Sequence, residues 1–367
     1  MGHNPVMPSD DTPSDPDPAP DSQDSPVVGQ AESGQKILQF LQRRLNLPPT
    51  LLHRWIRTGQ VRLNGGRCKP FARVQTGDVV RLPPFALKMA AQSGAVPVRT
   101  TDAVPEPPAL GASAPLPPVV GAEGPVWALF KPAGLPTHPG TGHSDSLATR
   151  LASHYPQAAF KPTPAHRLDK DTSGILLVAA TFAALRELQE AIRQRTLVKE
   201  YVVWVRGRWP WPEARLLRHQ VRKGLERGFE KMRAVLSAAG GERAREALCL
   251  ARPLRVREHE SLLLIRLFTG RTHQIRVQLA SLGHPVLGDV KYGPPGQRVG
   301  AGPMYLHALR VILPGGRVFA CLPDWGGEHA VDVLPEVMPA TAEHCPELLD
   351  DKAFPLAMNE DNYNLLH

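Results

Sequence analysis

The sequence AHRLDKDTSG at residues 165–174 runs directly into the apolar sequence ILLVA at residues 175–179. The apolar part has the length and the branched side chains of a buried strand. The polar part brings a His, carboxylates and two hydroxyls to the start of that strand. Since loops on a rigid scaffold often carry reactive groups, this stretch predicts a polar, potentially catalytic loop that opens into a core strand.

Each polar residue of this loop also has a purely structural explanation. His166 can be a satisfied polar residue, Asp171 can cap, and the hydroxyls of Thr172 and Ser173 can hold a turn. Gly174 can supply a positive φ angle. The loop by itself therefore leaves both a catalytic and a structural interpretation open.

Further motifs follow in a fixed order on both sides of the loop. They are FKPAGLPTHPG at residues 130–140, KEYVV at 199–203, TGRTHQIRV at 269–277, GHPVLGD at 283–289, KYG at 291–293 and LHA at 306–308. Together with HRLDKDTSG they closely resemble the signature of the RluA-type pseudouridine synthases over about residues 125–323. One such motif would be weak, but several collinear motifs make chance a poor explanation.

The resemblance implies an isomerase that converts uridine to pseudouridine in structured RNA, with large-subunit ribosomal RNA as the implied substrate. The reaction breaks the bond from ribose to a uracil nitrogen, turns the base and rejoins it through a ring carbon. Because nothing is oxidised and no group leaves for solvent, we expect no cofactor and no metal. A carboxylate can attack the anomeric carbon, assist glycal formation or add to carbon six of the base, and the sequence leaves these routes open.

The resemblance also assigns the catalytic residues. Asp169 corresponds to the nucleophile, and Arg276 to the cation that keeps this carboxylate ionised and oriented. Arg271 is a rival for that pairing. Tyr201 corresponds to the residue that stacks on the target uracil and helps to move a proton, although a strand Tyr packed in the core is an alternative.

Other residues of the predicted site surround the target base. The base must be extruded from folded RNA, and Arg167 resembles the residue that fills the vacated space; a phosphate contact is its alternative role. The expected pocket residues are His166, Leu168, Ile275 and Val277. Gln278 stands where family members often have a His, a departure that we expect to leave the chemistry intact.

Residues 34–87 are predicted to form a small α/β domain of two short helices and paired strands. The basic second helix, the VRLNG turn and the GDVV strand resemble the S-four-like RNA-binding domain. Asn64-Gly65 is a typical hairpin turn. Basic side chains on one face could follow RNA phosphates; they are Arg54, Arg57, Arg62, Arg67, Lys69 and Arg73.

Composition divides the rest of the chain. We predict an acidic disordered tail at residues 1–33, a Pro/Ala-rich linker at 88–123, the catalytic domain at 124–338 and an acidic tail at 339–367. Strand-like runs outnumber helices in the catalytic domain and do not alternate with them. The expected fold class is therefore α+β, with a mixed, largely antiparallel sheet and flanking helices.

Charge and cysteine content narrow the setting. The 43 Lys and Arg residues exceed the 35 Asp and Glu residues, for a net charge of +8. Because acids gather at both ends, the body is strongly basic and favours RNA as partner. No stretch is apolar enough to span a membrane, the N-terminus lacks a secretory signal, and the four cysteines are scattered. We expect a cytoplasmic monomer that needs no obligatory protein partner.

Three alternative functions differ in class or substrate. One is a catalytically silent RNA-binding or ribosome-assembly factor with the same fold; the presence of Asp169, Tyr201 and Arg276 argues against it. Another is a synthase that acts on transfer RNA. A third is an acid–base hydrolase that uses His166 and Asp169, but hydrolase, P-loop and dinucleotide motifs are missing. The triplet at residues 143–145, His-Ser-Asp, is expected to be a polar loop.

Overall fold

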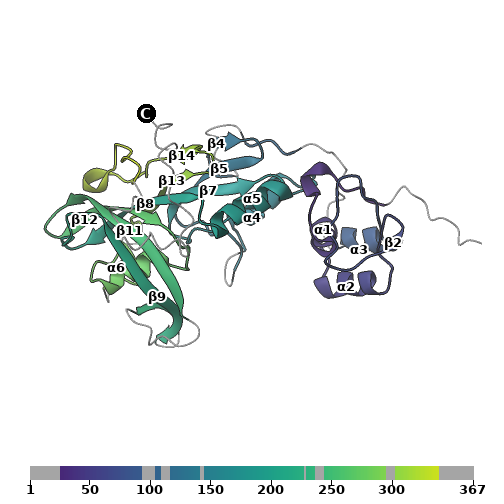
Figure 1. Ribbon diagram of the computed structural model, residues 1–367, viewed down its shortest axis with the longest axis horizontal. Coiled ribbons are helices and arrows are strands. Elements are labelled where there is room, and N and C mark those ends of the chain that lie inside the picture. Colours follow the sequence, from purple (N-terminus) through teal and green to yellow (C-terminus); the bar gives the residue numbers. More distant parts are fainter. Residues whose placement is uncertain are drawn as a thin grey trace, which may run out of the picture.

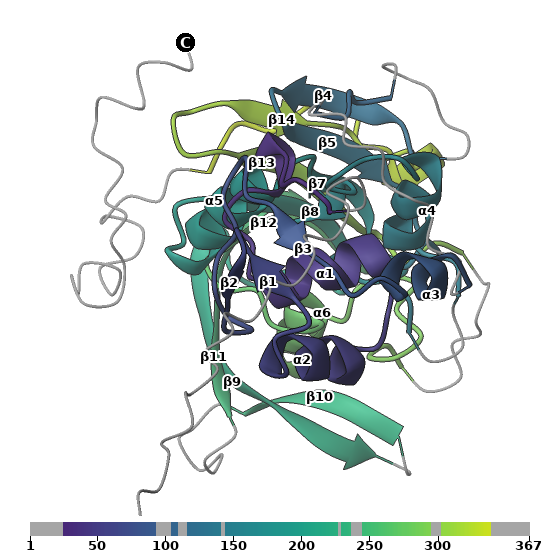
Figure 2. The same cartoon turned by 90° about the vertical axis from the view of Figure 1, so that its right-hand side faces the viewer.

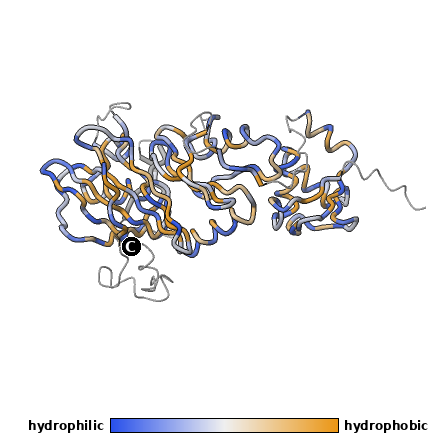
Figure 3. The backbone as a smooth tube through the Cα atoms, turned by 90° about the horizontal axis from the view of Figure 1, so that it is seen from above, coloured by the Kyte–Doolittle hydropathy of each residue, from blue (hydrophilic) through white to orange (hydrophobic). Residues whose placement is uncertain are grey.

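The computed structural model describes residues 25–92, 104–108, 116–140, 144–226, 229–235, 244–294 and 302–338. A large body built on one sheet lies beside a smaller N-terminal part (Figure 1). Hydrophobic stretches run through the interiors of both parts (Figure 3). Within the described ranges, no helix is long and apolar enough to cross a bilayer.

The large body contains a mixed sheet. Its main path runs in the order β10-β9-β11-β12-β8-β13-β7-β5-β4, and β14 and β6 pair with β13 and β7. Among the described pairs, β13 and β7 run parallel and the others antiparallel, which confirms the predicted α+β class. The strands are β4 (Val119–Glu123), β5 (Val126–Lys131), β6 (Thr163–Pro164), β7 (Ser173–Ala179), β8 (Val198–Arg206), β9 (Arg215–Glu226), β10 (Phe229–Val235), β11 (Arg245–Val256), β12 (Glu260–Leu267), β13 (Leu306–Ile312) and β14 (Val318–Ala320).

The central strand β7 is covered on both faces, which explains its unbroken apolar sequence. Ile175 and Leu177 pack in one cluster with α5 (Phe182–Arg193). Leu176 and Val178 pack in another with α4 (Leu147–His154) and α6 (Gln274–Ser281). Successive side chains of a strand point to opposite faces, so α5 lies on one face of the sheet and α4 and α6 lie on the other.

The face that carries α5 has a second cover. Val202 and Trp204 of β8 pack with Trp325, Val331 and Met338 of the C-terminal segment. A 3-10 turn, η3 (Gly327–His329), lies within this segment. Since residues 202 and 204 share a face, Tyr201 and Val203 point to the face of α4 and α6. The alternation of β8 therefore directs Tyr201 toward the helix that contains Arg276.

The N-terminal part has the predicted helices and hairpin. Its elements are α1 (Ile37–Leu45), α2 (Pro49–Arg57), β1 (Arg62–Leu63), β2 (Gly66–Arg67), β3 (Val80–Arg81) and α3 (Ala86–Gln92). Phe40, Leu52 and Trp55 form the centre of its core. Asn64 and Gly65 both have positive φ angles, 49° and 79°. Such angles at both central positions characterise the type I′ turn, whose twist suits a two-residue hairpin.

Two predicted boundaries are wrong. We expected disorder up to residue 33, but residues 25–33 pack on the small domain and contain the turn η2 (Gln30–Glu32). Glu32 is fully buried, and Arg44 donates to its carboxylate from Nε at 2.8 Å. This hydrogen bond compensates for the loss of solvent around the charge. The expected linker is also shorter, since α3 extends to residue 92 and β4, a strand of the large sheet, begins at residue 119. Residues 1–24 and 339–367 lie outside the described part.

The two parts touch through residues of the N-terminal segment and of α1. Ala31 is buried in a cluster with Phe160 and the α5 residue Leu185. The Arg43 guanidinium lies 4.5 Å from the centre of the Phe160 ring, and its Nη1 donates to Thr163 Oγ1 at 3.3 Å. The small domain therefore rests against the α5 face of the large body, and Figure 2 shows it in front of that body.

Candidate active site

The HRLDKDTSG loop ends where β7 meets β13 at very short range. Gly174 has a φ angle of +108°, and a Cβ at this position would lie 2.3 Å from the carbonyl oxygen of Ala308. Any other residue would clash with the β13 backbone, so glycine is required here. This close approach fixes the end of the loop that carries Asp169.

Two side chains, one from the last residue of β5 and one from the sequence after it, hold the loop from its other side. Thr137 Oγ1 donates to the carbonyl of Leu168 at 3.0 Å and accepts from the Leu168 N–H at 3.1 Å. Lys131 Nζ donates to three carbonyls, including that of Lys170 at 2.9 Å. Burial lowers the pKa of Lys131 to about 8, against the opposing effect of Asp171 and Asp169. The backbone on both sides of Asp169 is therefore fixed.

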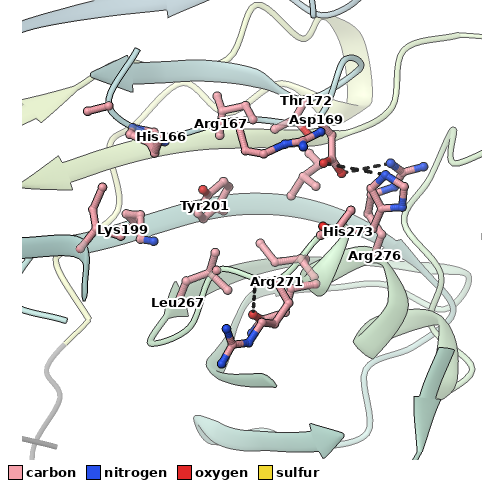
Figure 4. A pocket seen from close by; sticks show the side chains of 18 of the residues that line it. His166, Arg167, Asp169, Thr172, Lys199, Tyr201, Leu267, Arg271, His273 and Arg276 are labelled. Carbon is pink, nitrogen blue, oxygen red and sulfur yellow. Dashed lines mark hydrogen bonds and ion pairs between the residues drawn. The ribbon is translucent and has the colours of Figure 1, made fainter. Parts of the chain in front are cut away.

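A cavity of about 290 Å³ opens beside this loop (Figure 4). The loop contributes His166, Arg167, Leu168 and Asp169, β8 contributes Lys199 and Tyr201, and residues 270–276 close the remaining side. The structure thus brings together, in one cavity, residues that are separated by more than one hundred positions in the sequence.

Arg276 lies between two carboxylates. Its Nη1 donates to Asp169 Oδ2 at 3.1 Å, and its Nε and Nη2 donate to the two oxygens of Asp289 at 2.7 and 2.8 Å. Burial alone would lower the pKa of Arg276, but the two carboxylates raise it above its usual value. An arginine held in this way stays charged and has a fixed orientation.

Asp289 is a site residue that the sequence analysis missed, although it ends the quoted motif at residues 283–289. Its Oδ1 also accepts from the backbone N–H groups of Lys291 and Tyr292. Burial acts to raise the pKa of Asp289, but the Arg276 ion pair and these N–H groups lower it below its usual value. Asp289 therefore remains ionised and anchors Arg276.

The rival cation Arg271 does not pair with Asp169. Its Nε donates to the carbonyl of Glu246 at 2.8 Å, and its guanidinium points away from Asp169 in Figure 4. Arg271 lines the cavity, but the geometry gives the pairing role to Arg276.

Tyr201 and Lys199 face the cavity from the same side of β8. Tyr201 is 7% exposed, and burial together with the charge of Asp169 raises the pKa of its hydroxyl. The hydroxyl therefore stays protonated at neutral pH. Burial lowers the pKa of Lys199 to about 8. Between them, Glu200 points to the other face and forms a buried ion pair with Arg310 at 2.7 Å.

His166 lines the cavity but is committed to the backbone. Its Nε2 accepts from the N–H of Leu177 at 3.1 Å. Burial and then the charge of Lys199 lower the pKa of His166 to about 3, so the ring is neutral. A hydrolase pair of His166 and Asp169 therefore finds no support in this geometry, because the ring nitrogen that could act as a base already accepts a hydrogen bond.

Of the predicted pocket residues, Leu168 and Ile275 line the cavity. The prediction for Val277 is wrong: this side chain packs with Val221 and Ala247. The cavity is lined by the first turn of α6 only, at residues 274–276, and Val277 lies beyond it. Arg167 is exposed and also lines the cavity, close to Asp169 (Figure 4).

Gln278, where family members often have a His, has a structural role. This fully buried amide donates to the carbonyls of Leu217 and Ala247 at 3.0 and 3.2 Å, and it also contacts His219 Nδ1. It thereby fastens α6 to β9 and β11. Of the triplet at residues 143–145, position 143 lies outside the described residues, and Asp145 pairs with Arg150.

His273 is among the cavity residues that were not predicted as site residues. It precedes α6 with a left-handed φ angle of 54°. Its Nε2 lies 3.9 Å from Asp169 Oδ1, and its Nδ1 lies 2.7 Å from the hydroxyl of Tyr292. The motif at residues 269–277 contains this His, but the sequence alone gives no sign that it faces Asp169.

The small domain has a groove that contains four of the six predicted RNA-binding residues: Arg54, Arg57, Arg67 and Lys69. Arg62 and Arg73 do not line it. Arg73 instead donates from Nη1 to the carbonyl of Gly34 at 2.6 Å. In the described part of the chain, no three His, Cys, Asp or Glu side chains are grouped as metal ligands.

Comparisons with known proteins agree on one family. The model of the RNA pseudouridylate synthase family matches residues 125–281. "Ribosomal large subunit pseudouridine synthase C" of Haemophilus influenzae is 33% identical over 78% of this chain and 85% of its own length. The protein of the same name from Escherichia coli is 34% identical over 71% and 77%, respectively.

Among solved structures, "Human RNA Pseudouridylate Synthase Domain Containing 1" matches 60% of this chain and 86% of its own, with 27% identity and a TM-score of 0.48. The relatives above exceed 30% identity over more than two thirds of each chain. The chain therefore belongs to the RluA-type family of RNA pseudouridine synthases.

Proposed function

We propose that this enzyme converts specific uridines of large-subunit ribosomal RNA to pseudouridine, with Asp169 as the nucleophile. The observation that carries the proposal is the pair of Asp169 and Arg276, 3.1 Å apart, in a cavity that also contains Tyr201. The names of the bacterial relatives, which specify the large ribosomal subunit, support the choice of substrate.

Arg276 prepares Asp169 for reaction. A carboxylate must be ionised to act as a nucleophile, and a neighbouring cation favours the ionised form. Asp289 holds the guanidinium by two hydrogen bonds and leaves Nη1 for Asp169. The carboxylate then attacks the anomeric carbon, assists glycal formation or adds to carbon six of the base. Each route returns the carboxylate at the end, because the detached uracil is rejoined to the same ribose.

Tyr201 acts in its neutral form. Its raised pKa keeps the hydroxyl protonated, so the residue can stack on the uracil and donate a hydrogen bond. Arg167 is exposed beside the nucleophile. Its planar guanidinium can stack and form hydrogen bonds, which suits it to the space that the extruded base leaves in the RNA.

The groove of Arg54, Arg57, Arg67 and Lys69 is proposed to bind RNA phosphates outside the target site. Its four cations lie on one surface of the small domain, as electrostatic binding of a polyanion requires. We also propose that the enzyme acts in the cytoplasm as a monomer, without an obligatory protein partner. Because the isomerisation is redox-neutral, it requires no cofactor.

Mapping of pseudouridines tests the substrate. Cellular ribosomal and transfer RNA would be compared with and without the gene, and the gene would be restored as wild type or as Asp169→Asn. We expect one or a few large-subunit sites to disappear and to return with the wild type alone. Changes confined to transfer RNA would reject the proposed substrate. Unchanged maps, with RNA binding intact, would favour the catalytically silent alternative.

A further inference from the structure

A second polar group lies beside the nucleophile, near the carboxylate oxygen that Arg276 does not contact. Arg276 contacts Oδ2 of Asp169, whereas His273 Nε2 lies 3.9 Å from Oδ1. Both carboxylate oxygens thus have a nitrogen nearby (Figure 4). The first is already a hydrogen bond, and the second is about one ångström too long for one.

Tyr292 fixes the orientation of the His273 ring. The Tyr292 hydroxyl lies 2.7 Å from His273 Nδ1, and it accepts from the backbone N–H of Met232 at 3.3 Å. A phenol hydroxyl can accept one hydrogen bond and donate another, so Tyr292 can donate to Nδ1 while it accepts from Met232. A neutral imidazole carries one N–H, so an Nδ1 that accepts leaves the hydrogen on Nε2, the nitrogen that faces Asp169.

The burial of His273 favours the neutral ring. Loss of solvent is the largest effect on its pKa and lowers it. The nearby Asp169 and Asp289 raise the pKa, and Arg276 and Lys291 lower it, so that the pKa lies below its usual value. At neutral pH Asp169 therefore has the charged Arg276 at Oδ2 and a neutral imidazole near Oδ1.

We propose that His273, oriented by Tyr292, is a positioning residue that donates from Nε2 to Oδ1 of Asp169 and holds the carboxylate in its reactive orientation. This inference rests on the proposed role of Asp169 as nucleophile. The 3.9 Å separation shortens to a hydrogen bond when RNA occupies the cavity, since catalytic hydrogen bonds are often long in free enzymes.

The carboxylate needs this second donor. Arg276 gives two of its three hydrogen bonds to Asp289 and one to Asp169. A single bond to Oδ2 leaves the terminal torsion of the Asp169 side chain free to move, because that torsion has a broad energy profile. A donor on Oδ1 restricts it, and restricted orientation of a reacting group raises the rate of the chemical step.

The test uses four variants: His273→Met, His273→Gln, Tyr292→Phe and the double variant His273→Met/Tyr292→Phe. Met removes the donor at similar length, Gln keeps an N–H near the position of Nε2, and Phe removes the hydroxyl that orients the ring. Tritium release from carbon five of uridine in a large-subunit transcript gives kcat and KM, and circular dichroism verifies folding.

We expect His273→Met to lower kcat by about 100-fold with little change in KM, the scale expected when a reacting group is misplaced by about one ångström. His273→Gln should recover most of this loss. Tyr292→Phe should lower kcat by roughly tenfold, because the ring is retained and only its orientation is lost. The double variant should be no slower than His273→Met, since Tyr292 acts through His273.

Multiplied losses in the double variant, or wild-type kcat in a folded His273→Met protein, would overturn the proposal. Failure of Gln to improve on Met would overturn it as well. Asp169→Asn in the same assay separates the two claims. An inactive Asp169→Asn beside a fully active His273→Met rejects the positioning role alone, whereas an active Asp169→Asn rejects the nucleophile.

Discussion

At the scale of single residues, the site depends on how one buried arginine divides its hydrogen bonds. Arg276 gives Asp289 a bidentate contact and Asp169 a single one. Asp289 is in turn held by the backbone of residues 291 and 292. This arrangement keeps a charged guanidinium at Oδ2 of Asp169 and leaves Oδ1 for the proposed contact with His273.

Arg276→Lys tests this division. A lysine is a point charge on a flexible stem and cannot reproduce the fixed geometry of guanidinium toward two carboxylates. We expect kcat to fall by about 100-fold, since the nucleophile loses its orientation while the net charge is conserved. Arg271→Lys is the matched control and should stay within a few-fold of wild type. Equal losses in both variants would mean that Arg276 has no special role.

Lys199 gives a prediction about pH. Its pKa of about 8 results from burial, so the side chain is charged below pH 8 and neutral above it. A charged Lys199 in the cavity favours the phosphates of the bound nucleotide. KM for RNA should therefore rise between pH 7 and pH 9. Lys199→Met should have a higher KM at pH 7 and lose this rise, and an unaltered pH profile in the variant would contradict the assignment.

At the scale of elements, the sequence predicted the parts that carry a local pattern. The apolar run at residues 175–179 forms most of β7, as predicted. Strands β9 and β11 were not predicted, because their charged residues conceal the alternation. The assignment of Val277 was wrong because we placed all of the motif at residues 269–277 at the cavity. Its last residue packs instead against β9 and β11.

The contacts of the site had a different origin. Asp169 and Arg276 are 107 positions apart, and no local periodicity relates them; the family resemblance supplied both. Lys131, Thr137, His273 and Asp289 lie inside quoted motifs, yet their roles depend on which carbonyl or carboxylate they reach in the fold. Only the three-dimensional structure shows these contacts.

Gly174→Ala tests how β7 and β13 position the nucleophile loop. The added Cβ would lie 2.3 Å from a backbone oxygen at a φ angle of +108°. Backbone must shift to accept it, and we expect a loss of about 2 kcal/mol or more in the free energy of unfolding. Urea denaturation and kcat should both report the change. Gly140→Ala, which meets no atom within 4 Å at an ordinary φ angle, should resemble wild type; a neutral Gly174→Ala would contradict the tight approach.

At the scale of the whole molecule, the enzyme presents two basic features on parts that touch each other. Arg43 and Ala31 join the small domain to the α5 face of the large body. The groove of four cations lies on the small domain, and the catalytic cavity lies in the large body. Contact between the parts restricts the distance from groove to cavity, so an RNA that occupies both must span that distance.

Removing the groove cations tests the contribution of the small domain to RNA binding. The variant with Arg54, Arg57, Arg67 and Lys69 all changed to Ala should bind ribosomal RNA more weakly. The slope of log affinity against log salt should become shallower. With fewer phosphate contacts, fewer counterions are released from the RNA on binding. Arg62→Ala/Arg73→Ala, which changes predicted residues outside the groove, is the control. An unchanged salt slope in the fourfold variant would assign RNA binding to the large body alone.

The central claim is that the carboxylate of Asp169 performs the chemical step. The most direct measurement is single-turnover pseudouridine formation by Asp169→Asn, with Asp171→Asn as the matched control, because Asp171 is an exposed carboxylate two residues away. RNA affinity is measured in parallel. We predict no detectable product from Asp169→Asn with near wild-type affinity, and near wild-type turnover from Asp171→Asn. Turnover at the wild-type rate by Asp169→Asn would contradict the account.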